Sequence, residues 1–212
     1  MPKVRSRATY HHGDLRQALI DAALAIIVEN RDAANVSLRE AARRVGVSQA
    51  APYRHFADKD ALLAAVAEEG FQRLLKALDI DTGSAPNPLA RLQSSGVAYV
   101  KFAIAHPAHY RVMFSTFRIE QGNDSTLNAA AGEAFAVMVD AIVAGQAMGA
   151  IQPGPPRQLA WITWSLVHGL ALLLIDRQLP VVDEQDMLSL VTLATQSLVY
   201  GLQKPSSGLH YS

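Results

Sequence analysis

Cysteine is absent from this chain of 212 residues, and its absence excludes disulfide bonds and thiolate metal sites. Neither sign of charge is in excess, because 19 basic side chains balance 19 acidic ones. A long hydrophobic run is missing too. The most apolar stretch, residues 161–175, contains Thr163, Ser165 and His168 and is shorter than the roughly 20 residues that cross a bilayer. The polar residues 1–16 lack the apolar segment of a signal peptide, so we expect a cytoplasmic protein without a membrane partner.

Motifs of enzymes and metal sites are equally scarce. The sequence has no Gly-rich phosphate loop, nucleophile elbow or HExxH string. Carboxylates adjoin at 68–69 and 183–184, but neighbouring residues of a helix do not face each other. His106 and His109 are separated by Pro107, which indicates a helix junction, and no third ligand is identifiable. We expect no catalytic residues, no cofactor and no metal site, with an enzyme and a metal sensor as the weaker alternatives.

The apolar half of the composition is enough for a packed core, since 50% of the residues are hydrophobic and 18% are charged. Apolar residues recur at helical spacing, as in residues 15–27, and no convincing stretch alternates with the period of two that a strand requires. Gly, Pro, Ser and Asn collect in residues 81–88, where we expect a loop. The sequence predicts an all-α fold of about nine helices, at residues 15–30, 38–45, 49–55, 59–78, 88–105, 107–117, 125–149, 156–176 and 184–202.

Residues 37–62 carry the sharpest local signals for helix ends. Ser37 precedes Glu40 by three residues, which is the capping-box pattern of a helix start. Gly46 is placed to end that helix, and Ser48 to cap a second short one. Two short helices joined by a glycine turn are typical of a helix-turn-helix motif, which lays its second helix in the major groove of DNA. We expect their shared core to consist of Leu38, Ala42, Val45, Val47, Tyr53 and Phe56.

The same stretch resembles the TetR family of regulators. Gly46-Val47-Ser48 and Tyr53-Arg54-His55-Phe56 match the family's pattern, with Lys59 and Leu62 at its spacing, while Pro52 stands where an aliphatic residue is more usual. The resemblance implies a helix-turn-helix DNA-binding domain over residues 1–60 and a ligand-binding and dimerisation domain over residues 61–212, in which residues 61–80 form a connecting helix. It also implies a homodimer that binds a palindromic operator in double-stranded DNA.

The resemblance assigns DNA contacts position by position. Gln49 and Ala50 are expected to meet base edges, since a Gln amide pairs with adenine and an Ala methyl touches thymine. The other polar and basic side chains are expected to meet phosphates. The full set of expected contacts is Ser37, Arg43, Arg44, Ser48, Gln49, Ala50, Tyr53, His55 and Lys59. A basic arm of Lys3, Arg5, Arg7, His11 and His12 precedes the motif and is either a further contact or a solvated tail.

Charge is distributed as a DNA-binding end requires, although the whole chain is neutral. Residues 1–60 carry ten Lys and Arg against seven Asp and Glu, whereas residues 61–212 carry nine against twelve. A basic end on an acidic remainder directs that end toward phosphates.

Two strings in the second part of the chain, residues 106–114 and 164–169, resemble one TetR subgroup whose C-terminal domain is marked by a Trp, a His and a Gly. That resemblance implies a ligand cavity among the middle helices. Large rings interleaved with Ala and Gly can leave an apolar gap for a small molecule, although the same rings can simply fill a core. We expect the ligand site to be drawn from Tyr99, Phe102, Tyr110, Met113, Phe114, Phe117, Phe135, Met138, Trp161, Trp164, Ser165 and His168.

Apolar stripes on the last two helices predict a dimer interface built as a four-helix bundle. The stripes consist of Leu166, Leu170, Leu173 and Leu174 on one helix and Met187, Leu190, Val191, Ala194, Leu198 and Leu202 on the other. The sequence therefore predicts a ligand-responsive transcription regulator, specifically a repressor released by a small apolar or aromatic effector. An activator, a corepressor-type regulator and a non-specific DNA-binding protein without a ligand remain as alternatives.

Overall fold

The computed structural model describes residues 12–82, 85–116 and 125–203 of the chain. These residues form eight α-helices and two short 3-10 turns, and they contain no strand beyond an isolated bridge between Ile151 and Gln203. The all-α prediction is therefore confirmed, and the number of α-helices in the described part is close to the nine expected. Phe117 and residues 3–11 of the basic arm lie outside the described residues.

Prolines and capping side chains set many of the helix bounds. Pro88, Pro107 and Pro156 each open a helix, where a missing N–H costs no intrahelical bond. Asn87 caps the helix that Pro88 opens, because its Oδ1 accepts a hydrogen bond from the Ala90 N–H at 2.9 Å. The elements are α1 (His12–Asn30), η1 (Ala33–Asn35), α2 (Leu38–Val45), η2 (Pro52–Arg54), α3 (Lys59–Thr82), α4 (Pro88–Ala105), α5 (Pro107–Thr116), α6 (Ser125–Ala147), α7 (Pro156–Ile175) and α8 (Glu184–Leu202).

The second helix of the expected motif differs from the prediction. Instead of a helix over residues 49–55, the chain forms only the 3-10 turn η2. A helix that started at residue 49 would need the N–H of residue 52 to bond to the Ser48 carbonyl, and Pro52 has none. The Ser48 carbonyl instead accepts a hydrogen bond from the Ala51 N–H at 3.0 Å, which closes a single turn.

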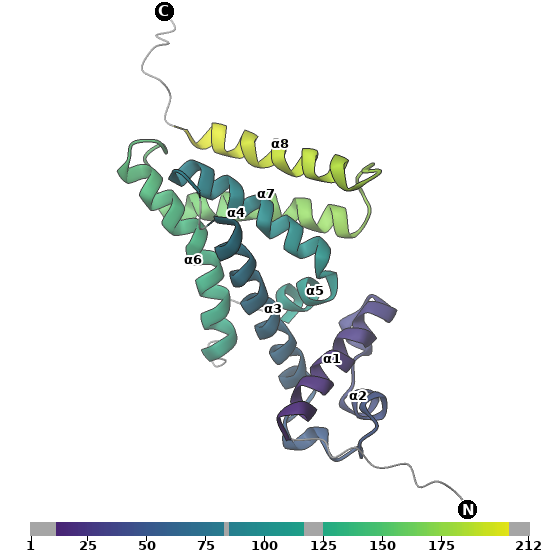
Figure 1. The fold of residues 1–212 in the computed structure, drawn as a ribbon. Helices are drawn as coiled ribbons and strands as arrows, with labels where there is room; N and C mark the ends of the chain where they lie inside the picture. Colours follow the sequence, from purple (N-terminus) through teal and green to yellow (C-terminus); the bar gives the residue numbers. More distant parts are fainter. Residues whose placement is uncertain (1–11, 83–84, 117–124, 204–212) are drawn as a thin grey trace, which may run out of the picture.

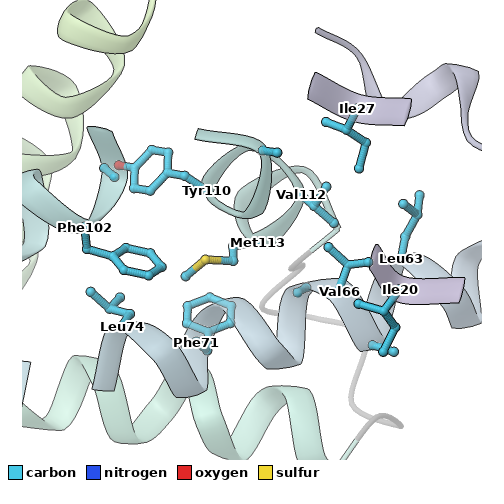
Figure 2. Packing of buried hydrophobic residues seen from close by; sticks show 14 of the residues in the cluster. Ile20, Ile27, Leu63, Val66, Phe71, Leu74, Phe102, Tyr110, Val112 and Met113 are labelled. Carbon is cyan, nitrogen blue, oxygen red and sulfur yellow. The ribbon is translucent and has the colours of Figure 1, made fainter. Parts of the chain in front are cut away.

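α3 connects the two ends of the molecule (Figure 1). At one end lie α1, η1, α2 and η2, together named the head, and at the other α3 packs against α4, α5 and α6. Figure 2 shows Ile20 of α1 beside Leu63 and Val66 of α3, and Phe71 of the same helix beside Met113 of α5. Buried side chains of both ends belong to one continuous cluster, so the head is joined to the other helices by packing as well as by the chain.

α6 and α7 contain the most apolar long segments of the described residues. By length and composition alone, Thr126–Ala147 and Pro156–Ile175 are each long and apolar enough to cross a membrane. The same composition is typical of helices inside a bundle, and both helices pack against α4 and against each other. α7 nevertheless keeps an exposed apolar face that includes Ile162 and Leu166, and such a face indicates a site of contact with a partner.

The predicted dimer interface is wrong for Val191 and Leu202 of the last helix and for Leu170 of the helix before it, because these side chains face the protomer's own core. Val191 and Leu202 of α8 are 1% and 5% exposed, and Leu170 of α7 is 9% exposed. Helical spacing identifies an apolar face but does not tell which face the protomer itself covers. The remaining predicted side chains that pack against the buried clusters are Leu174, Met187, Leu190, Ala194 and Leu198.

Candidate nucleic-acid interface and ligand pocket

The start of α2 and the turn after it have the geometry that the sequence predicts. Ser37 caps the helix, since its Oγ accepts a hydrogen bond from the Glu40 N–H at 3.2 Å. Gly46 ends the helix with a φ of 78°, in the left-handed region that favours glycine. Its N–H donates to the Ala42 carbonyl at 3.0 Å, so the helix end is closed. The chain then turns sharply and places residues 48–54 beside α2.

Residues 48–54, named the recognition segment, project a short run of polar and small side chains into solvent. Residues 48–50 are all exposed, and Tyr53 is 53% exposed. Pro52 and Phe56 are buried and anchor the segment to the head. The expectation that Tyr53 belongs to the shared core is wrong, because the single 3-10 turn leaves its ring outside. The exposed ring is available to a partner instead.

Arg43 and Arg44, both expected to contact phosphates, take part in ion pairs within the head. Arg44 joins α2 to α1, because its guanidinium donates to the Glu29 carboxylate at 2.6 and 2.7 Å and to Glu40 at 3.0 Å. Arg43 donates to Glu40 at 2.7 and 2.8 Å. The hydrogen bonds from Arg43 and Arg44 lower the pKa of Glu40 to about 2, so its carboxylate is charged at neutral pH. Arg43 is the more accessible of the two, since 72% of its side chain is exposed against 24% for Arg44.

The remaining predicted contacts differ in how freely they face solvent. Lys59 donates from its Nζ to the Ala34 carbonyl at 2.6 Å, which ties η1 to the start of α3, and His55 is half-buried. Two exposed arginines that the sequence analysis did not select, Arg39 and Arg54, make no ion pair in the described part of the chain. Arg54 had a signal, because it lies inside the matched string at one of its variable positions.

A cavity of about 390 Å³, named the inner cavity, is lined by side chains from α3, α4, α5, α6 and α7 and is open to solvent on one side, where Trp161 and Arg157 are exposed. Its walls are mainly aromatic. Of the predicted ligand residues, Tyr99, Phe114, Phe135, Met138, Trp161 and Trp164 line it. The sequence analysis missed Phe71 and Leu74 because it treated their helix only as a connector, and it also missed Asn128, Ala131, Gly132, Ala134 and Arg157.

A wider depression of about 1130 Å³, named the outer cavity, lies between the head and the helices α5, α6 and α7. Tyr110 and His168 line this cavity, whereas Phe114 and Asn128 line both. The two cavities are therefore neighbours that share a wall.

Three further predicted ligand residues line neither cavity. Phe102 and Met113 are 4% and 0% exposed and belong to the main core. Ser165 faces solvent, and its Oγ donates to the Trp161 carbonyl of the preceding turn at 2.7 Å. A serine bonded to its own helix in this way does not point at a ligand.

Four side chains between the cavities form one hydrogen-bonded chain. The Trp164 Nε1–H donates to the Tyr99 hydroxyl at 3.0 Å. The Tyr99 and Tyr110 hydroxyl oxygens are 3.1 Å apart, and the His168 Nδ1 lies 2.7 Å from Tyr110 and 3.0 Å from Tyr99. One assignment satisfies every group: Tyr99 donates to Tyr110, Tyr110 donates to the unprotonated Nδ1, and the imidazole proton is on Nε2.

Burial keeps this chain uncharged. Burial raises the pKa of the Tyr99 hydroxyl. It also raises the pKa of the Tyr110 hydroxyl, and the neighbouring Tyr99 hydroxyl raises that pKa further. Burial lowers the pKa of His168, so its imidazole is neutral at pH 7. The inner cavity is consequently bordered by neutral dipoles on the side of α4.

Comparison with known families gives two matches. Residues 19–66 match the family "Bacterial regulatory proteins, tetR family", and residues 92–197 match "Tetracyclin repressor-like, C-terminal domain". No curated protein sequence matches the chain at a significant level.

Solved structures share the fold over nearly their whole length. A protein of unknown function from Rhodococcus sp. RHA1 is 34% identical with a TM-score of 0.79, and the match covers 93% of this chain and 100% of that one. The transcriptional regulator FadR from Bacillus subtilis, solved in complex with stearoyl-CoA, is 17% identical with a TM-score of 0.70 over 88% and 98% of the two chains. The ketosteroid transcriptional regulator KstR2 of Mycobacterium tuberculosis is 18% identical with a TM-score of 0.67 over 94% and 100%. At such identities, the likeness to FadR and KstR2 is one of fold.

The capped helix-turn-helix head and the hollow helical bundle behind it define a one-component regulator, in which one chain holds both a DNA-binding motif and a helical ligand-binding domain. Together with the two family matches, they show that the chain belongs to the TetR family of bacterial regulatory proteins. It is a DNA-binding transcription regulator of that family. The domain boundary at residue 60 and the individual contact residues stay predictions.

Proposed function

We propose that this regulator is a homodimeric repressor that binds a palindromic operator and is released by a small apolar effector in the inner cavity. The observation that carries the proposal is the course of α3. This helix begins five residues after the recognition segment and contributes Phe71 and Leu74 to the wall of the inner cavity. A ligand that moves these side chains moves the helix on which the head is mounted. It favours release only to the extent that it binds the released state more tightly.

The walls of the inner cavity favour an apolar effector. Its volume of about 390 Å³ is within the range of small-molecule sites, roughly 300–1,000 Å³. Rings of Phe71, Phe135, Trp161 and Trp164 make up much of the lining. Two proteins of the same fold agree with this choice, since FadR was solved with stearoyl-CoA and KstR2 is a ketosteroid regulator.

Exposed apolar side chains on α7 and α8 support the dimer. Ile162, Leu166 and Leu173 of α7 are 57%, 38% and 38% exposed, and they lie on one face of the helix. Leu193 and Tyr200 of α8 are 61% and 78% exposed and also share a face. A second copy that pairs the same two faces would bury these side chains in a twofold four-helix arrangement.

A dimer of this kind presents two recognition segments to successive major grooves, about 34–36 Å apart or a multiple of that distance. In this proposal Gln49 and Ala50 read base edges, and Ser48, Tyr53 and Arg43 bind phosphates. The proposed set of DNA contacts is completed by Ser37, Arg44, His55 and Lys59. The protein would act in the cytoplasm, where its operator lies.

The proposal is tested by fluorescence anisotropy of labelled DNA from upstream of the protein's own gene, with scrambled DNA as the reference and two salt concentrations. We expect dimer-stoichiometric binding to a palindromic segment. Tyr53→Ala should weaken it about ten-fold or more, because each half-site loses a contact of about 1 kcal/mol. Gln49→Ala should weaken operator binding as well, and Gln72→Ala on α3 is its matched control, since Gln72 is exposed and lies outside the head.

Other outcomes of the same titration contradict the proposal in separate ways. Equal binding to both DNAs with a steep loss at the higher salt would indicate non-specific attraction to phosphates. Binding that tightens when effector is added would make the protein a corepressor-type regulator or an activator. If the Tyr53 and Gln49 variants bind the operator with unchanged affinity, the recognition segment is not part of the DNA interface.

A further inference from the structure

One charged side chain, the solvent-exposed Arg157, borders the inner cavity. Among the lining residues Arg157 is the only charged one, and no carboxylate borders the cavity. The guanidinium of Arg157 lies over the Phe135 ring, 5.5 Å from its centre, at the first turn of α7. No ion pair involves Arg157 in the described part of the chain. By contrast, the arginines that do pair with carboxylates are Arg43, Arg44, Arg73 and Arg111.

The polar groups that line the cavity differ in whether they already have hydrogen-bond partners. The Tyr99 hydroxyl already accepts from Trp164 and donates within the hydrogen-bonded chain, so a ligand cannot bind it without breaking that chain. The Asn128 amide has no hydrogen bond among the described residues and lines the cavity where it adjoins the outer one. Arg157, Asn128 and the indole N–H of Trp161 are therefore free to meet a ligand, and of these only Arg157 is charged.

Arg157 and Asn128 lie well apart along the cavity. Asn128 and Phe135 are both on α6, and seven residues of α-helix span about 10 Å. Arg157 lies over Phe135, and Met138, one turn further along α6, also lines the cavity. Between Asn128 and Phe135, α6 presents only small side chains to the cavity, and a Cβ added at Gly132 would meet no atom within 4 Å. The space between is a slot with aromatic walls about 10 Å long.

We infer that the effector is an organic anion, with an apolar body that fills this slot and a carboxylate or similar group that binds Arg157. The inference rests on the proposed function, because it assigns a chemical class to the effector of the inner cavity. The attraction of an anion to Arg157 is stronger beside the apolar walls than in open water. A neutral ligand of the same shape leaves the exposed guanidinium to water alone, and a cation is repelled by it.

A pair of fluorescent dyes that differ in charge tests whether the cavity prefers an anionic ligand. Anilinonaphthalenesulfonate and phenylnaphthylamine have the same aromatic skeleton, and only the first carries an anionic group. We expect the wild-type dimer to bind the sulfonate dye at least about ten-fold more tightly, as one charge-assisted hydrogen bond provides. Arg157→Gln should remove that preference while the affinity for the neutral dye stays the same, and Arg157→Lys should restore most of it. Arg91→Gln, an exposed arginine of α4 outside the cavity, is the matched control.

A second variant shows where the dyes bind. Gly132→Phe adds a ring at an exposed lining position with open space at its Cβ, so the variant should fold and obstruct the binding of both dyes. Circular dichroism of each variant checks the helical content. A preference that survives in Arg157→Gln, or equal affinity of wild type for the two dyes, overturns the anionic class and leaves the cavity as the effector site. If Gly132→Phe binds both dyes with wild-type affinity, the inner cavity is not a ligand site, and the part of the proposed function that concerns the effector is wrong.

Discussion

Removing one hydroxyl at a time from the chain Trp164–Tyr99–Tyr110–His168 should have unequal effects on stability. In Tyr110→Phe the His168 Nδ1 loses its donor at 2.7 Å, but the Tyr99 hydroxyl lies 3.0 Å from the same nitrogen and can turn its proton toward it. Every remaining group then keeps a partner. In Tyr99→Phe the Trp164 N–H loses the hydroxyl to which it donates, and no second acceptor for it is present among the described residues.

The magnitudes follow from this difference. Tyr110→Phe removes about one net hydrogen bond, so we expect the free energy of unfolding to fall by about 0.5–1.5 kcal/mol. Tyr99→Phe also leaves a partly buried N–H unsatisfied, which costs about 1–3 kcal/mol. Tyr99→Phe should therefore be the more destabilising variant, although Tyr110, at 0% exposed, is the more deeply buried of the two rings. An argument from burial alone does not predict this order, since both substitutions keep the ring and Tyr110 is the more deeply buried.

Urea unfolding followed by circular dichroism at one fixed protein concentration measures both variants, because the stability of a dimer depends on concentration. The double variant provides the coupling energy of the pair. A loss in Tyr110→Phe equal to or larger than that in Tyr99→Phe would refute the hydrogen-bond assignment. It would mean that the Tyr99 hydroxyl does not turn toward His168.

Two glycines and two histidines provide the remaining predictions. Gly132→Ala should raise the free energy of unfolding by about 0.5–1 kcal/mol, since it lies inside a helix with open space at its Cβ, whereas Gly70→Ala should lower it because its Cβ would lie 2.6 Å from the Met113 sulfur. Urea unfolding of the two variants measures these changes. A change of the same sign in the free energy of unfolding of both variants would contradict this packing. Burial lowers the pKa values of His109 and His168 in the folded protein, so below about pH 6.5 the unfolded chain binds more protons and stability should fall as the pH drops from 7 to 5.5. His168→Asn should make that slope shallower, and a wild-type stability that does not vary over this interval would show that these histidines are not held neutral.

The head was predictable because its signals are local. Ser37, Glu40 and Gly46 fix the ends of α2 through capping bonds and one left-handed residue, and these contacts span at most four residues. The family pattern covers the same stretch. Where the prediction failed, at residues 49–55, the cause was also local: a helix was expected across Pro52, although the missing N–H at that position permits only a shorter turn.

The cavity and the dimer face could be predicted only in part, because they depend on contacts between distant helices. The aromatic residues were correctly associated with the bundle, but composition does not tell which rings border a gap. Phe114 borders one, while Met113, its neighbour in the chain, fills the core. Arg157 had no signal at all in the sequence, since a lone arginine at a helix start is usually a solvated surface residue. Its significance appears only once α6 and α7 lie side by side.

Coupling between the two ends requires that a displacement at the cavity reach the head without being absorbed on the way. Phe71 of α3 borders the inner cavity. Glu69, two residues before it on the same helix, accepts a hydrogen bond from Gln17 of α1 at 3.0 Å. Two residues apart on a helix cannot move independently, because the backbone hydrogen bonds fix their separation. Gly70 between them packs so closely on Met113 of α5 that no methyl group would fit, and Figure 2 shows this sulfur between the rings of the core. A close-packed interior rearranges between discrete states more readily than it compresses, so under the proposed function a ligand that displaces Phe71 would shift α3 against α5 and carry α1 with it.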